Sequence, residues 1–124
     1  MDLMDSKELA RKIAETLADR HITNIVTIDV SEKTAVTNYY VVGTARNATV
    51  AKTASDYLQD KLEGENKDGI FAAGKEGERE GRWIVLDYGL VIVHIFHTDL
   101  RDFYDFEKLW AEPDGSNVER FMTV

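Results

Sequence analysis

A chain of 124 residues, 44% hydrophobic and 31% charged, is long enough to bury the core of one globular domain. Its formal net charge of -8 opposes binding to phosphate backbones and favours a basic protein surface as partner. The absence of cysteine excludes disulfides and thiolate metal sites, and no apolar run is long enough to span a bilayer. Since the first residues also lack the pattern of a secretory or transit peptide, we expect a reducing, cytoplasmic setting.

The first half of the chain changes between helical and strand periodicity. Asp5 followed by Glu8 suits a capping box at the start of a helix, and Thr44 or Asn47 could cap a second one. Apolar spacing predicts, in chain order, a helix over about 5–20, strands over 24–30 and 39–43, and a helix over about 47–63. The short connection between the two strands makes that pair antiparallel.

The second half is organised around a predicted hairpin. Two apolar runs rich in β-branched residues flank Asp87-Tyr88-Gly89, where the glycine suits a positive φ. Further elements are predicted around it: a charged, glycine-rich loop over 63–82 with one short strand at 70–73, the hairpin itself over 83–97, an aromatic-rich helical segment over 100–110, and a flexible tail over 112–124.

This order of elements predicts an α/β (α+β) fold. A mixed sheet of four to five strands would carry its helices mainly on one face and leave the other face open. We expect one domain over 1–111, followed by the tail over 112–124. The hairpin runs do not alternate cleanly, which is typical of strands covered on both faces. The helices can supply only part of that cover, so a partner is expected to complete the surface.

Residues for catalysis or metal binding are poorly supported. His94 and His97 would point to opposite faces of a strand, and no serine lies in a nucleophile elbow. A nucleotidyltransferase needs two acids at positions i and i+2, but neither Asp29 nor Asp87 has the second acid. We therefore predict no enzyme activity, cofactor or metal. A nucleotide-binding enzyme of nucleotidyltransferase type is the alternative, because the outline of the fold suits it.

Aromatic residues on the hairpin instead indicate protein binding. Strand parity places Trp83, Val85 and Asp87 on one face of the first strand, and Ile92, His94 and Phe96 on one face of the second. Trp83 and Tyr88 bracket the acid Asp87, a combination typical of binding hot spots. The competing interpretation is that Trp83 is an ordinary core residue.

Several of these segments together resemble the ribosomal silencing factor family, also called Iojap-like proteins. The resemblance covers about residues 6–110, and its most specific part is Leu86-Asp87-Tyr88-Gly89 followed by His94, Phe96 and a terminal Leu109-Trp110. Residues 28–31 and 37–44 look like the first two strands of the family. Asn38 and Leu90 depart from the pattern, because an acid is expected at each position.

The resemblance implies a nonenzymatic factor with a nucleotidyltransferase-like fold. Members of the family bind the large ribosomal subunit through ribosomal protein uL-fourteen, block joining of the small subunit and lower translation, and organellar relatives are associated with large-subunit assembly. Self-association of the free protein through the same open face is left open, and no membrane or direct nucleic-acid partner is implied. The binding role is carried onto six residues: Trp83, Leu86, Asp87, Tyr88, His94 and Phe96.

Overall fold

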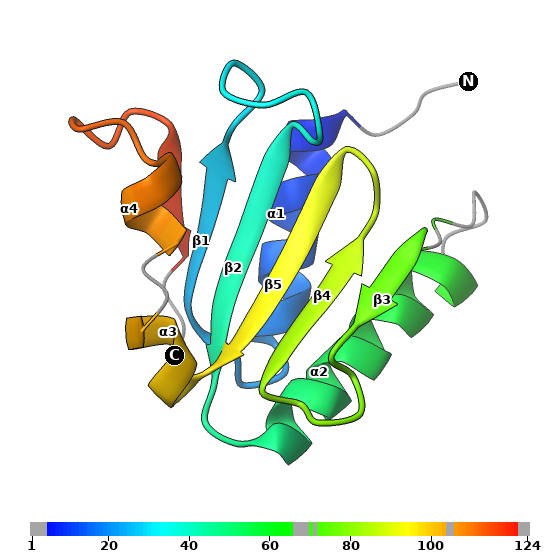
Figure 1. The fold of residues 1–124 in the computed structure, drawn as a ribbon. Helices are drawn as coiled ribbons and strands as arrows, with labels where there is room; N and C mark the ends of the chain where they lie inside the picture. The colour runs from blue at the N-terminus through cyan, green and yellow to red at the C-terminus, as the bar shows by residue number, and fades with distance from the viewer. Residues whose placement is uncertain (1–4, 66–69, 71, 104–105, 122–124) are drawn as a thin grey trace.

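The computed structural model of the chain, which describes residues 5–65, 70, 72–103 and 106–121, contains a six-stranded sheet and two layers of helix around it (Figure 1). The strands are β1 (Thr23–Asp29), β2 (Tyr39–Ala45), β3 (Gly74–Glu76), β4 (Trp83–Asp87), β5 (Val91–His97) and β6 (Val118–Phe121). The helices are α1 (Ser6–Ala18), α2 (Ala48–Asp60) with its π-helical extension η1 (Lys61–Glu65), α3 (Thr98–Phe103) and α4 (Phe106–Trp110).

The strand order is β3-β4-β5-β2-β1-β6, and only the central pair β2 and β5 is parallel. The predicted antiparallel pairing of the first two strands is confirmed, as is the hairpin of β4 and β5. Gly89 closes that hairpin with a φ of 80°, a conformation that glycine adopts without strain, and its amide donates to the Asp87 carboxylate at 2.8 Å. The turn is therefore encoded by its own residues.

Both long helices begin at the polar residues expected to cap them. The Glu8 amide donates to the Asp5 carboxylate at 2.8 Å, and the Val50 amide donates to the Asn47 side chain at 2.8 Å. Asn47 is thus the cap of α2, while Thr44 lies within β2. Each cap satisfies an amide that has no partner within its helix, which sets the starting residue locally.

The two faces of the sheet are covered unequally. In Figure 1, α1 and α2 lie behind the sheet, and their apolar residues form the larger core with the rear side chains of the strands. On the other face, which we call the open face, α3 and α4 lie toward the β1 side of the sheet. Within the described ranges, no helix covers β3 and β4 on this face. The predicted architecture, with helices mainly on one face, is confirmed.

The strand count of four to five is too low, because both edge strands depend on distant pairing. The predicted strand at 70–73 is displaced to β3: Ile70 and Ala72 lie outside strands, and residue 71 is outside the described residues. The sixth strand, β6, lies within 112–124, where the sequence predicted only a flexible tail. It pairs with β1, and the Glu119 carboxylate accepts two hydrogen bonds from Arg11 of α1 at 2.9 and 2.7 Å. Four residues of ordinary composition carry too little pattern to reveal such a strand.

Candidate functional site

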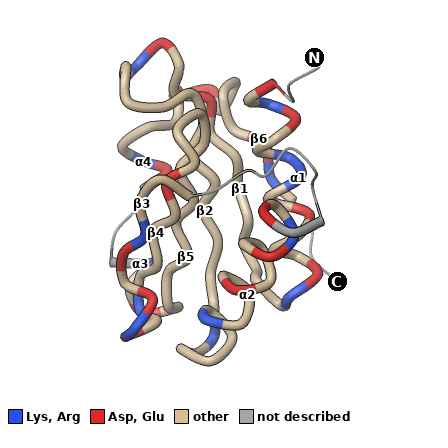
Figure 2. Tube along the Cα trace, turned by 90° about the vertical axis from the view of Figure 1, so that its right-hand side faces the viewer, with Lys and Arg blue, Asp and Glu red and all other residues tan. Residues whose placement is uncertain are grey.

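The strand register arranges the side chains of the open face in three rows that cross the sheet. The first row is Trp83, Phe96, Thr44; the second is Glu76, Val85, His94, Val42, Val26, Arg120; the third is Asp87, Ile92, Tyr40, Ile28, Val118. The predicted parity is confirmed, since the sets from β4 and β5 lie directly opposite each other on one face. The central strands β2 and β5 carry no charged residue, and Figure 2 shows them uncoloured between charged helices and loops.

Aromatic rings form a continuous layer across this face. Trp83 stacks on Phe96 with ring centroids 4.8 Å apart, and its indole Nε1 donates to Nδ1 of His94 at 3.1 Å. His94 meets Tyr40 edge-on at 5.4 Å, and Tyr40 in turn lies 5.2 Å from Trp110 of α4. Because Nδ1 of His94 accepts a hydrogen bond, it carries no proton. Burial lowers the pKa of His94 to about 4, which keeps the ring neutral at physiological pH.

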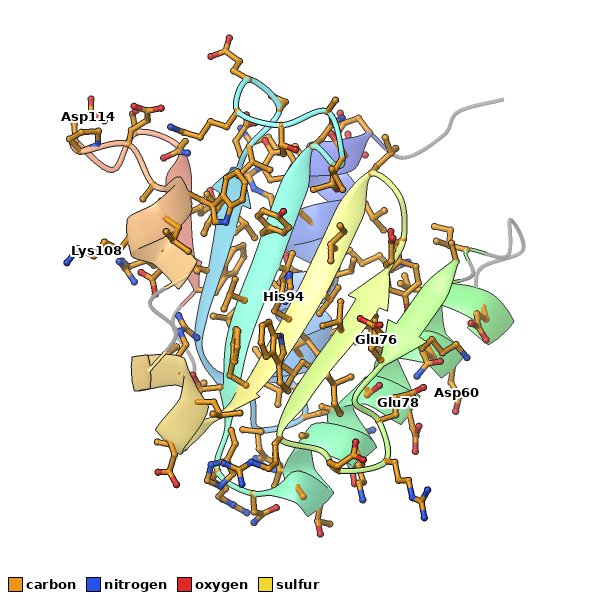
Figure 3. The ribbon with its side chains drawn as sticks, viewed as in Figure 1. Asp60, Glu76, Glu78, His94, Lys108 and Asp114 are labelled. Atoms are coloured by element: carbon orange, nitrogen blue, oxygen red, sulfur yellow. The ribbon has the colours of Figure 1, made fainter. Side chains whose placement is uncertain are left out.

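Across strands β2, β5, β4 and β3, the side chains of this face that reach the surface lie on β3 and β4. Trp83, Val85 and Asp87 are half-buried and Glu76 is exposed, whereas Phe96 has no exposed surface. Figure 3 labels His94 near the centre of the sheet and Glu76 toward the β3 edge. The accessible strip, defined as Glu76, Trp83, Val85 and Asp87, therefore combines apolar and aromatic surface with two carboxylates.

The loop between β3 and β4 holds the strip in place. The Glu78 carboxylate accepts hydrogen bonds from Gln59 at 2.9 Å and Ser55 at 3.4 Å, both on α2. Gly77 has a φ of 77°, and a Cβ there would lie 1.9 Å from the carbonyl oxygen of Trp83. The loop thus packs directly against the start of β4, and only glycine permits that approach. This contact fixes where the Trp83 backbone enters the sheet.

Histidine and acidic side chains are the groups of this chain that could bind a metal ion. Among the described residues, no group of three or more His, Cys, Asp or Glu side chains is placed to hold a metal ion. His97 lies on the opposite face of β5 from His94, as strand parity predicted. Within the same ranges, no helix combines the length and the apolar character needed to cross a membrane.

Comparison with known proteins agrees with the sequence resemblance. Residues 3–123 match the family model described as ribosomal silencing factor during starvation, RsfS. The chain belongs to the ribosomal silencing factor family. The predicted family is thereby confirmed over nearly the full sequence.

Individual relatives support the family assignment and the fold. The ribosomal silencing factor RsfS of Haemophilus influenzae is 35% identical over 103 residues, covering 83% of this chain and 98% of that protein. The crystal structure of protein CV0518 from Chromobacterium violaceum superposes with a TM-score of 0.80 at 30% identity, covering 91% of this chain and 93% of that one. The mouse mitochondrial assembly of ribosomal large subunit protein 1 is 23% identical, covering 80% of this chain and 43% of that protein.

Two of the six residues assigned a binding role from the sequence lie on the wrong side of the sheet. Leu86 is fully buried in the core beneath α1 and α2, because the two-residue period of a strand turns it away from Val85 and Asp87. Tyr88 also packs into that core with 8% of its surface exposed, and burial raises the pKa of its phenol, helped by the charges of Glu63 and Glu78. We therefore remove both from the candidate surface of this silencing-factor chain.

The remaining four residues lie together on the open face but differ in access. Trp83 and Asp87 reach the surface, while His94 and Phe96 lie beneath Trp83 and support it. Sequence reasoning missed Glu76, because the short strand was predicted at 70–73 and Glu76 then fell in a loop. The signal that could have found it is the alternation of side chains through β3, which becomes visible only once β3 is paired with β4.

Proposed function

We propose that this member of the family binds the large ribosomal subunit through ribosomal protein uL-fourteen, prevents the small subunit from joining, and so represses translation in the cytoplasm. Membership of the family supports the ribosomal role. The named partner follows from the sequence resemblance, and the net charge of -8 is complementary to a basic ribosomal protein. In this proposal the protein acts by occupying a site and transforms no substrate.

The observation that carries the proposal is the accessible strip on β4 and β3. Trp83 offers a half-buried ring that is already held by Phe96 and His94, so little conformational entropy would be lost when a partner covers it. Asp87 lies four residues further along the strand on the same face, and its carboxylate is oriented by the Gly89 amide. A preorganised aromatic residue beside an oriented acid is the arrangement expected at the centre of a protein interface.

Steric inhibition requires only modest contact. A specific interface buries about 800 Å² on each partner, and a few central residues supply most of its binding energy. A sheet face with one aromatic anchor and a charged margin can meet that requirement. The rate of subunit joining would then fall in proportion to occupancy of the large subunit, without any chemical step.

The test is cosedimentation of the purified protein with large ribosomal subunits, together with light scattering to follow subunit joining. The Trp83→Ala variant should lose about 2 kcal/mol or more of binding. Because Trp83 also packs against Phe96, its folding is checked by circular dichroism. Asp87→Asn retains an acceptor for the Gly89 amide and should weaken binding without altering the fold. If folded variants cosediment and block joining as well as the wild type does, the proposed surface is refuted.

The alternative of a nucleotide-binding enzyme is tested separately by thermal shift. A ligand that binds the native state raises its melting temperature, so each nucleoside triphosphate is added with magnesium. The proposal predicts no shift with any of the four. A shift that saturates with one nucleotide would favour the enzyme.

A role in large-subunit assembly is a second candidate, favoured by the name of the mouse relative. It predicts that depletion of the protein from growing cells causes precursors of the large subunit to accumulate. A silencing role alone predicts normal subunit profiles during growth and a change only when nutrients run short. Sucrose-gradient profiles under both conditions separate the two roles.

A further inference from the structure

We infer that the partner protein contacts the β3 end of the accessible strip, where Glu76 and Asp87 together receive one of its basic side chains in the open space beside Gly74. This inference builds on the proposed function, because it names the chemistry that the partner presents to the strip. It gives Glu76 of the strip a direct contact, adds Gly74 to the binding surface, and predicts an arginine or lysine at one defined position of the partner.

The register of β3 and β4 creates the space. Glu76 lies opposite Val85 and Gly74 lies opposite Asp87, so Glu76 and Asp87 are diagonal neighbours on the open face. Diagonal positions in an antiparallel pair place their Cβ atoms roughly 7 Å apart, which lets one guanidinium or ammonium group reach both carboxylates. Gly74 contributes no side chain to the position between them. Among the described residues, a Cβ added there would meet only the Cβ of Asp87, at 3.8 Å, so these residues leave the position open to an incoming group.

The two carboxylates are not neutralised within the part of the chain that the structure describes. Asp87 accepts a hydrogen bond from the Gly89 amide at 2.8 Å, which orients one oxygen, and no ion pair joins either acid to a described lysine or arginine. Lys75, the adjacent residue in β3, belongs to the other face with Leu86. Within the described ranges, the basic residue next to Glu76 in sequence therefore does not compete for the position.

The surroundings favour a cation carried by a protein over other ligands. Val85 lies beside the two acids and Trp83 lies two residues before it in the strand. The aliphatic stem of an arginine or lysine would therefore contact apolar surface while its charged end meets the carboxylates. A phosphate group would be repelled by both acids, which argues against direct contact with ribosomal RNA at this point. The occupant we propose is thus a basic side chain of a protein.

Two variants of the full-length protein test the inference through different physical effects. Glu76→Gln removes one charge and keeps the shape of the side chain, and its matched control is Asp56→Asn, which removes the same charge from an exposed position of α2. Gly74→Val leaves the charge unchanged and fills the open space, and a β-branched residue is well tolerated in an edge strand. Binding of each protein to purified large ribosomal subunits is measured across a series of salt concentrations, after its melting temperature has been compared with that of the wild type.

We expect Glu76→Gln to weaken binding by about threefold to tenfold at low salt, with the difference shrinking as salt rises. Gly74→Val should weaken binding by about tenfold, and Asp56→Asn should not change it. A shared cation also requires that the losses from Glu76→Gln and Asp87→Asn be less than additive when combined. Normal binding by both the Glu76 and Gly74 variants, or fully additive losses, would overturn the inference.

The design separates failure of this inference from failure of the proposed function. If the wild-type protein does not bind large subunits, the proposed function is refuted. If the wild type binds and Trp83→Ala weakens binding while the β3 variants do not, the interface ends at β4 and the inference alone is refuted. Equal loss with Glu76→Gln and Asp56→Asn would show that only net charge matters, and this too would refute a defined cation position.

Discussion

The neutral, buried His94 predicts a specific dependence of stability on pH. Burial lowers its pKa from 6.5 to about 4 in the folded protein, so between these values the unfolded chain binds a proton that the folded chain does not. Folding stability contributed by the neutral ring is therefore fully present above pH 6.5 and is lost as the pH falls toward 4. For these two pKa values, linkage gives a loss of about 2 kcal/mol between about pH 7.5 and about pH 5.

The measurement is the free energy of unfolding in urea at both pH values. His94→Asn removes the titrating group and retains an oxygen that can accept a hydrogen bond from Nε1 of Trp83. Between the two pH values, the variant should therefore lose roughly 2 kcal/mol less free energy of unfolding than the wild type loses. His21→Asn is the matched control, because His21 is exposed at a φ of 67°, a conformation that asparagine tolerates well. Surface carboxylates are the same in both variants, so their contribution cancels when the pH dependence of the free energy of unfolding is compared between the variants. If wild type and His94→Asn show the same pH dependence, His94 is not held neutral by burial.

Further predictions concern the turn glycines and the face assignment of the hairpin. Gly77→Ala should destabilise the protein by more than about 2 kcal/mol, because its Cβ would collide with the Trp83 carbonyl, whereas Gly89→Ala adds a Cβ with nothing within 4 Å and should cost only about 1 kcal/mol of backbone strain. Equal losses in urea unfolding would contradict the tight loop packing. Leu86→Ala should lower the free energy of unfolding by about 3 kcal/mol, yet the folded fraction should bind large subunits normally, in contrast to Trp83→Ala. Weaker binding by folded Leu86→Ala would place that residue back on the interface.

Local sequence signals predicted the elements whose stabilising contacts lie within a few residues. Asp5 and Asn47 cap their helices through amides three positions ahead, and Gly89 closes a turn between adjacent strands. Strand parity likewise predicted that Trp83 and Asp87 share a face, because alternation follows from backbone geometry alone. Caps, turns and strand alternation can therefore be predicted from residues that are close together in the sequence.

Other features required the folded arrangement. Edge strand β6 is held by pairing with β1 and by the bond between Glu119 and Arg11, partners far apart in the chain. Motif position alone also assigned Leu86 and Tyr88 to the binding surface, although their exposure depends on which face the helices cover.

By itself, then, the amino-acid sequence determined the family, the main helices and the central hairpin, and the faces to which the side chains of β4 and β5 belong. Only the tertiary structure decided which of those faces is accessible, and only it brought Glu76 beside Asp87 across the pairing of β3 with β4. The physical reason is range: caps, turns and alternation follow from local backbone geometry, whereas accessibility and edge pairing depend on elements that meet only after the chain has folded.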